Sequence, residues 1–194
     1  MKKNIAKLKS FVIKASKNKS FLHHDWFVEY HLNIVERIAL ELCNVYKKAD
    51  KNVVLALVWV HDYGKILDMK KEHKLNHESE KLLIKLGFPK DFIKKITEFL
   101  DIFEHYMEKD LKKAPIEVQI VSSADAASHM IGPFFSIYWK EYNKKSIPEL
   151  MKKNTNKLMK DWERKITLPE VKKSFKQRNE FFKEQVGNFP KKYL

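Results

Sequence analysis

The chain is poor in the residues that characterise disulfide-stabilised, β-rich or membrane-spanning proteins. Cys43 is its only cysteine, which excludes an intramolecular disulfide and is compatible with a reducing compartment. Four glycines and six prolines are too few for the many turns of an all-β protein. The apolar run at 53–60 is too short to span a bilayer, and the one at 11–13 is too short for a secretion signal. We therefore expect a cytoplasmic protein without membrane association.

The residues that are present predict an all-α protein. With 194 residues, of which 44% are hydrophobic and 12% aromatic, the chain can bury one good core. Lys, Glu, Leu and Ile recur at helical spacing, and no internal repeat or low-complexity linker divides the sequence. We predict a single domain over 1–194. Its core is expected at about 21–130, with C-terminal helices at 134–187 packed on that core and loose ends.

Apolar spacing and end signals locate the individual helices. One apolar face over 21–47 includes His31 and predicts the first helix. Asp50 is the predicted N-cap of a buried helix that runs through Asp62 and stops at Gly64, although so β-branched a run also fits a strand. Further helices are predicted at 76–87, 89–107, 115–132 and 134–142, then after two capping boxes, Ser146 to Glu149 and Thr167 to Glu170.

Four polar side chains on these helices would need a common partner. His31 lies on an inward face, His61 and Asp62 follow the buried apolar run, and Asp125 lies inward on the helix after position 115. Imidazole nitrogen and carboxylate oxygen together suit Mn, Fe, Co, Zn or Mg. One such histidine is more often a hydrogen-bonded core residue, but four buried polar groups are costly unless one cation satisfies them all. The set therefore predicts a divalent metal site.

The same residues resemble the HD-domain superfamily of metal-dependent phosphohydrolases. That pattern is a histidine, an adjacent His-Asp pair and a distant aspartate on a later helix, and the resemblance covers about 21–126. It implies a helical bundle of the HD-domain type and one ion held by His31, His61, Asp62 and Asp125. The local contexts that carry it are His31 with Val35, His61-Asp62-Tyr63-Gly64-Lys65, and Ala124-Asp125-Ala126.

Members of the superfamily that hold two metals have extra histidines between the His-Asp pair and the last aspartate. The resemblance therefore implies that His77 and His105 hold a second ion, which Asp62 bridges to the first. His73, one helical turn before His77, competes for the same place. The alternative is that these histidines are polar residues at helix ends. One or two divalent ions are expected.

The resemblance also implies the chemistry. A small phosphorylated substrate, with a nucleotide as the favoured class, would be hydrolysed by metal-activated water that attacks phosphorus. Asp62 and Lys65 are the predicted catalytic residues. Lys65 lies three residues after Asp62 and would reach substrate phosphate as a point charge, the alternative being a surface lysine. Monoester and diester hydrolysis both stay open.

Arg178 is a further candidate for binding substrate phosphate. Its spacing places it on one stripe with Val171, Phe175 and Phe182, so a guanidinium interrupts an otherwise apolar face. Such a group needs an anion. Substrate phosphate and a buried carboxylate are equally compatible with the pattern.

Lys157 and His129 are also compatible with a place near the site. Lys157 shares a helix face with Asn154 and Asp161 and would either line the substrate pocket or belong to a solvated face. His129 follows Asp125 by one helical turn and would either orient that carboxylate or be a polar residue at a helix end. Lys157 is retained as a predicted substrate-binding residue.

The net charge of +14 raises a second class of function. An excess of 39 basic over 25 acidic residues would attract phosphates, nucleotides or nucleic acid. Only three of the cations are arginines, and the lysines are spread along the chain without a concentrated stripe. The alternatives to a hydrolase are therefore a basic helical nucleic-acid-binding protein and a catalytically inactive HD-like binding domain. Spacing does not specify the oligomeric state.

Overall fold

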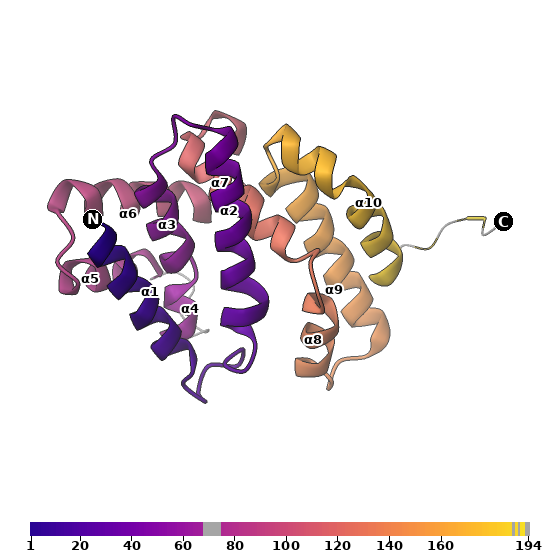
Figure 1. Ribbon diagram of the computed structural model, residues 1–194. Helices are drawn as coiled ribbons and strands as arrows, with labels where there is room; N and C mark the ends of the chain where they lie inside the picture. The colour runs from indigo at the N-terminus through magenta and orange to yellow at the C-terminus, as the bar shows by residue number, and fades with distance from the viewer. Residues whose placement is uncertain (68–74, 188, 190, 193–194) are drawn as a thin grey trace.

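The computed structural model describes residues 1–67, 75–187, 189 and 191–192. Within these ranges every regular element is a helix and no strand occurs, so the predicted all-α class is confirmed (Figure 1). In the same part of the chain, no helix is long and apolar enough to cross a membrane. The elements are α1 (Lys2–Ser16), η1 (Val28–Leu32), α2 (Asn33–Val45), α3 (Lys51–Val60), α4 (Tyr63–Leu67), α5 (Leu75–Lys85), α6 (Lys90–Glu104), η3 (Leu111–Lys113), α7 (Ile116–Ser128), α8 (Phe134–Glu141), α9 (Ile147–Lys160), η4 (Asp161–Lys165) and α10 (Pro169–Gln185).

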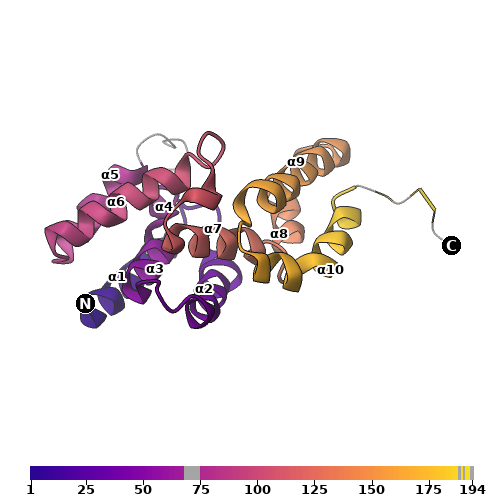
Figure 2. The ribbon, with the colours of Figure 1, turned by 90° about the horizontal axis from the view of Figure 1, so that it is seen from above.

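Helix α7 lies at the centre of the molecule, and nearly all of its residues are buried. It contacts α2, α3 and α6 from the first part of the chain, and η4 and α10 from the last part. Figures 1 and 2 show α8, α9 and α10 on the side of α7 opposite to α1 and α3. Ala124, Ala126 and Ala127 on α7 are fully buried, and side chains this small allow neighbouring helices to approach closely. This helix carries Asp125 into the interior.

Helix α3 delivers the His-Asp pair to the same interior. The Asp50 carboxylate accepts hydrogen bonds from the backbone N–H groups of Asn52 and Val53, so the predicted N-cap and the helix that follows it are confirmed, and the strand alternative is wrong. The predicted stop at Gly64 is also wrong. Helix α3 ends at Val60, and Gly64 lies inside α4, because the Asp62 carbonyl accepts hydrogen bonds from the next turn and restarts the helix.

The N-terminal segment is an ordered helix, so the expectation of a loose end is wrong there. Helix α1 buries Ile5, Leu8 and Val12 and contacts α3 and α4. These apolar residues recur at steps of three and four among lysines, which is the pattern of an amphipathic helix that covers a core. The N-terminal helix thus belongs to the same hydrophobic core as α3.

The first predicted helix, over 21–47, is shorter and less regular than expected. Residues 21–26 form turns, and the regular helix begins only after η1, which is a π-helical segment. The backbone N–H of Asn33 donates to the Val28 carbonyl, five residues earlier. This wider turn carries His31, which is buried as predicted.

The two predicted capping boxes have different outcomes. Ser146 forms one, because the Glu149 carboxylate accepts from both its backbone N–H and its hydroxyl, and α9 begins there. The predicted box at Thr167 is wrong, and α10 begins at Pro169 with Leu168 as its N-cap. The Thr167 hydroxyl instead donates to Gln119 on α7, while the Glu170 carboxylate accepts from the hydroxyl of Tyr46. Both side chains hold α10 against its neighbours.

Candidate metal centre

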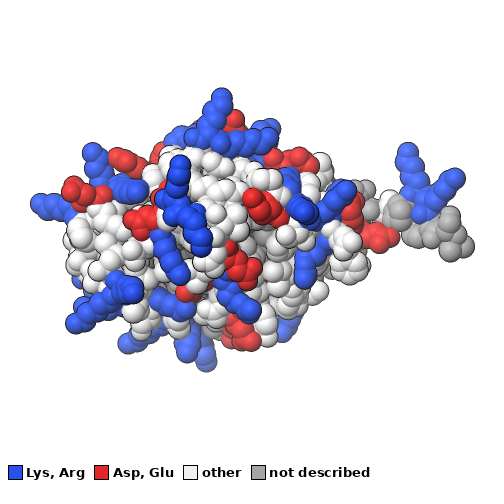
Figure 3. Space-filling model, turned by 45° about the horizontal axis from the view of Figure 1, so that its top comes forward, with Lys and Arg blue, Asp and Glu red and all other residues white. Residues whose placement is uncertain are grey.

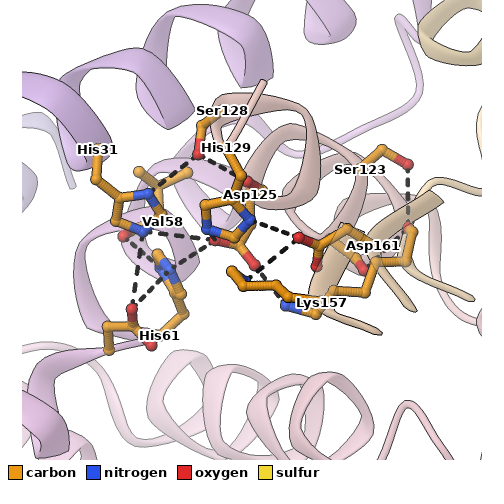
Figure 4. Close-up of polar contacts among 12 residues, drawn as sticks. His31, Val58, His61, Ser123, Asp125, Ser128, His129, Lys157 and Asp161 are labelled. Atoms are coloured by element: carbon orange, nitrogen blue, oxygen red, sulfur yellow. Dashed lines mark hydrogen bonds and ion pairs between the residues drawn. The ribbon is translucent and has the colours of Figure 1, made fainter. Parts of the chain in front are cut away.

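Four side chains from three places in the sequence meet beside α7. His31 comes from η1, His61 and Asp62 from the turn after α3, and Asp125 from α7 (Figure 4). The His31 Nε2 lies 3.4 Å from an Asp125 oxygen and 3.7 Å from an Asp62 oxygen. The His61 Nε2 lies 3.6 Å from each of the same two oxygens. The structure therefore brings together all four residues predicted to hold the first ion.

The hydrogen bonds at the far side of each ring decide which nitrogen faces the site. The His61 Nδ1 lies 2.9 Å from the Val58 carbonyl, which can only accept, so Nδ1 carries the proton. The Ser128 hydroxyl donates to the Asp125 carbonyl at 2.7 Å and is therefore free to accept from the His31 Nδ1 at 3.0 Å. In the neutral form of both rings, Nε2 carries the lone pair and points at the carboxylates, which is the tautomer that metal ligation requires. Burial lowers the pKa of His61, but the Asp62 and Asp125 carboxylates outweigh it and raise that pKa, so a cation that binds Nε2 would displace a proton.

A cation fits between these atoms. The Nε2 atoms of His31 and His61 are buried and have no hydrogen-bond partner in the described part of the chain. They face carboxylate oxygens, so only acceptors line the space between them. Ligand atoms bound to one ion at about 2.0–2.2 Å lie roughly 3.0–3.5 Å apart, close to the separations found here. Nitrogen and oxygen donors of this kind suit a divalent transition ion or magnesium.

His129 adds a third imidazole to this cluster. Its Nδ1 lies 2.8 Å from an Asp161 carboxylate oxygen, which accepts, so its Nε2 also carries a lone pair. That Nε2 lies 3.7 Å from the Asp125 oxygen that His31 and His61 face. His31, Asp125 and His129 form one group able to hold an ion, and His31, His61 and Asp62 form another. The sequence placed His129 next to Asp125 but did not identify it as a possible ligand.

The carboxylates of the cluster are held in the ionised form that binds metal. Burial opposes ionisation of Asp62, but the Lys65 ammonium and the His61 ring outweigh it and hold the pKa of that carboxyl well below its usual range. Burial opposes ionisation of Asp125 in the same way, and Lys165 is the main group that keeps its pKa well below the usual range. Both groups are therefore anions at neutral pH.

The outer shell of the cluster comes from α9 and η4. Burial opposes ionisation of Asp161 too, yet Lys157 and then His129 lower its pKa to about 2. Burial and the Lys157 charge lower the pKa of His129 to about 4, against the pull of Asp161. His129 is thus a neutral imidazole at neutral pH, able to bind a metal ion through Nε2, and Asp161 fixes its orientation.

Three lysines pair with the three carboxylates of the site. The Lys65 Nζ lies 2.6 Å from Asp62, the Lys165 Nζ lies 2.5 Å from Asp125, and the Lys157 Nζ lies 3.3 Å from Asp161. Their side chains are 43%, 12% and 31% exposed, whereas the ligand atoms of His31 and His61 are buried. The ammonium groups therefore lie between the buried cluster and solvent.

The histidines predicted to hold a second ion are placed differently. His77 is exposed on α5. His105 follows α6 with its side chain 44% exposed, and its Nδ1 is 2.8 Å from the Asp101 carbonyl. Neither belongs to a group able to hold a metal ion in the described part of the chain. His73 lies outside the described residues.

Arg178 does not occupy the apolar surroundings expected for it. It is exposed on α10, with its guanidinium 5.8 Å from the centre of the Phe175 ring, and the next residue, Asn179, is fully buried instead. The predicted inward position of Arg178 is wrong, because the buried face of α10 runs through Val171 and Asn179. Its contact with substrate phosphate stays a prediction.

Glu104 is a further carboxyl group near the site. It lies at the end of α6, half-buried, and one carboxylate oxygen has no hydrogen-bond partner among the described residues. Burial raises its pKa to about 7, although His105 and Lys65 lower it. The charges of Lys65 and Asp62 both act on the pKa of this carboxyl group, so it lies near the cluster.

The comparison with protein families matches residues 28–130, more than half of the chain, to the HD domain. The chain belongs to the HD-domain family. Members of this family are generally metal-dependent hydrolases, so the predicted resemblance is confirmed. Searches of curated proteins and of solved structures returned no match.

The HD-domain match includes every ligand of the first predicted ion and His129, but not the lysines and the aspartate from α9 and η4. A groove of about 430 Å³ between α2 and α10, lined in part by Ile38 and Phe175, contains none of the cluster residues. The groups able to hold a metal ion in the described part of the chain therefore lie in the buried polar cluster and not in this groove. The charged residues around this cluster come partly from α9 and η4, which lie beyond the segment matched to the HD domain.

Proposed function

We propose that this HD-domain protein is a divalent-metal-dependent phosphohydrolase that acts on a small phosphorylated substrate, with a nucleotide as the class that the family resemblance favours. One observation carries the proposal: two buried imidazole nitrogens, of His31 and His61, face two ionised carboxylates and have no hydrogen-bond partner among the described residues. Burying two imidazole nitrogens without a hydrogen-bond partner is costly unless a cation binds them. His31, His61, Asp62 and Asp125 would hold the ion, with His129 as a fifth donor.

An ion held there would supply an activated water for attack on phosphorus and would offset charge on the phosphoryl oxygens. In the overall reaction the water oxygen bonds to phosphorus, the ester P–O bond breaks, and the leaving oxygen gains a proton. A monoester would give an alcohol and inorganic phosphate, and a diester would give an alcohol and a phosphomonoester. Lys65, next to Asp62 and partly exposed, would donate hydrogen bonds to a phosphate oxygen. Asp62 and Lys65 thus keep the catalytic roles predicted for them.

The described residues support a site for one ion. His77, exposed on α5, and His105, which follows α6, would be required for a second ion, and both lie outside the cluster. A second ion bridged by Asp62 stays a prediction of the family resemblance. The metal count per chain distinguishes the two arrangements.

A nucleic-acid-binding protein is the main alternative function, because the net charge is +14. On the face drawn in Figure 3, however, Lys and Arg side chains are spread over the surface with Asp and Glu between them. Binding through phosphate contacts weakens steeply as salt rises, whereas a metal-dependent hydrolase loses activity to a chelator. The buried cluster favours the hydrolase.

The test is metal content per chain by elemental analysis, together with hydrolysis of p-nitrophenyl phosphate, on protein purified without chelator. Wild type and Asp62→Asn are compared with Glu180→Gln, which removes an exposed carboxylate that also pairs with a lysine three residues on. We expect wild type and Glu180→Gln to hold metal and hydrolyse the ester, and Asp62→Asn to lose both.

Unimpaired hydrolysis by Asp62→Asn would refute the proposed role of that residue. Wild type without metal, even after incubation with Mn²⁺, would instead favour the binding-protein alternative. Two ions lost together from Asp62→Asn would support the bridged two-metal arrangement.

A further inference from the structure

The charges in direct contact around the cluster are balanced before any ion binds. Each of the three carboxylates has its own lysine partner, in the pairs Asp62 with Lys65, Asp125 with Lys165, and Asp161 with Lys157. Imidazoles that ligate a metal are neutral. A divalent ion would therefore add two positive charges that the contacting residues do not offset. Glu104 makes no ion pair in the described part of the chain and stays outside this count.

Each of the two ligand carboxylates directs one oxygen to the imidazole rings and the other to a lysine. One oxygen of Asp125 faces His31 and His61, while the other accepts from the Lys165 ammonium at 2.5 Å. One oxygen of Asp62 faces the same two rings, while the other accepts from Lys65. An ion between the rings would thus have an ammonium group beside each of its carboxylate ligands. Each ammonium has three donors, so further donors are available to a second anion.

Lys165 is held in this place by several independent contacts. Its ammonium lies 5.1 Å from the ring centres of both Phe103 and Tyr106, and its side chain is only 12% exposed. Its backbone carbonyl accepts hydrogen bonds from the hydroxyl of Ser122 at 3.1 Å and from that of Ser123 at 3.5 Å. Its partner Asp125 faces the same two imidazole rings as Asp62, the partner of Lys65, so two ammonium charges lie beside one cluster and repel one another. An anion between them would relieve that repulsion.

Resting on the proposed function, we infer that Lys165 binds the substrate phosphate together with Lys65, and that this phosphate is a dianion, as in a phosphomonoester. A dianion offers the ion and the two ammonium groups twice the charge of the monoanionic phosphate of a diester, and so binds there more tightly. Lys165 lies outside the HD-domain match, so its part in the site belongs to this chain's C-terminal region.

The test is calorimetric titration of Mn²⁺-loaded protein with inorganic phosphate and with dimethyl phosphate, a monoanion, at about pH 8, where a phosphate monoester is fully ionised. Wild type is compared with Lys165→Met and with Lys9→Met. Lys9 is a matched control, because it also pairs with a carboxylate, Glu36 at 2.7 Å, and lies over an aromatic ring, that of Trp59. Metal content is measured on each sample.

We expect wild type and Lys9→Met to bind phosphate alike, and Lys165→Met to keep its metal but bind phosphate at least about tenfold more weakly. Wild type should bind dimethyl phosphate at least about tenfold more weakly than phosphate. Equal phosphate affinity in Lys165→Met and wild type would refute the role of Lys165. Equal affinity of wild type for the two anions would refute the dianion, and this comparison needs no variant to fold.

The outcomes separate this inference from the proposed function. Wild type that holds metal and hydrolyses a phosphate ester, but binds phosphate independently of Lys165, overturns the inference alone. Wild type that holds no metal overturns both. If Lys165→Met does not fold, Lys165→Gln replaces it, since the amide keeps a polar group beside Asp125.

Discussion

Two regions of the chain meet at the candidate site and contribute opposite kinds of group. The HD-domain segment, 28–130, supplies buried imidazoles and carboxylates, which are ligands for a cation. The later segment, 157–165, supplies Lys157 and Lys165 together with Asp161. The first region carries the residues that define the family, whereas the second sets the charge around them. The family match therefore includes the proposed metal ligands and Lys65, but not Lys157, Asp161 and Lys165.

The two regions share one local feature, a π-helical turn at the site. In η1 the N–H of Asn33 donates to Val28, and in η4 the N–H of Ile166 donates to Asp161, five residues earlier in each case. These segments carry His31 in η1, and Asp161 and Lys165 in η4, all of which contact residues of the cluster. π-Helical turns are rare in proteins as a whole, and those that occur are often found at functional sites.

The largest effect on metal binding and activity is expected at Asp125, which contacts residues from both regions. Asp125→Asn removes a charged ligand of the proposed ion and the partner of Lys165. We expect loss of bound metal and a fall in kcat/KM for p-nitrophenyl phosphate of about a thousandfold or more, since the activated water is lost. Elemental analysis and steady-state kinetics measure both. Retention of metal in this variant would show that the carboxylate is not a ligand.

The same substitution at Asp161 is expected to have a smaller effect. Asp161→Asn leaves every proposed ligand in place but removes the carboxylate that orients His129 and pairs with Lys157. Loss of an outer partner of this kind lowers metal affinity or activity by roughly 10–100-fold. Glu163→Gln, exposed in the same π-helical segment, is the control. An effect as large as that of Asp125→Asn would remove the distinction drawn between the two regions.

The smallest expected effect concerns Glu104 and the pH dependence of stability. Its pKa in the folded protein is raised from 4.5 to about 7 by burial, so between these pH values the folded state binds the proton more tightly than the unfolded state. The free energy of unfolding therefore falls as pH rises through this window. Allowing for solvent screening of a half-exposed group, the loss is about 1 kcal/mol.

Glu104→Gln cannot lose a proton and should not show this part of the pH dependence. Urea unfolding at pH values on either side of the window compares it with wild type and with Glu98→Gln, an exposed position on the same helix. The variant should gain stability relative to wild type at the higher pH. An unchanged difference between wild type and Glu104→Gln across the window would contradict the raised pKa.

Sequence reasoning succeeded where the signal is local. Asp50 caps α3 and Glu149 completes the box at α9 because those contacts join residues two or three positions apart. Thr167 and Glu170 carry the same signature, yet they bond to Gln119 and Tyr46, which are distant in sequence. The inward position predicted for Arg178 was wrong because packing turns Asn179, about 100° further around α10, to the buried face instead. Neither outcome can be read from helical spacing.

The sequence by itself determined the all-α class, the burial of His31 and Asp125, and the order of the residues that resemble the HD domain, because helical period and chain order are local properties. Only the tertiary structure decided that His129 joins the cluster and that Lys165 pairs with Asp125, forty positions away in sequence. That pairing depends on how η4 packs against α7. Among so many lysines spread along the chain, packing alone selects the ones that reach the site.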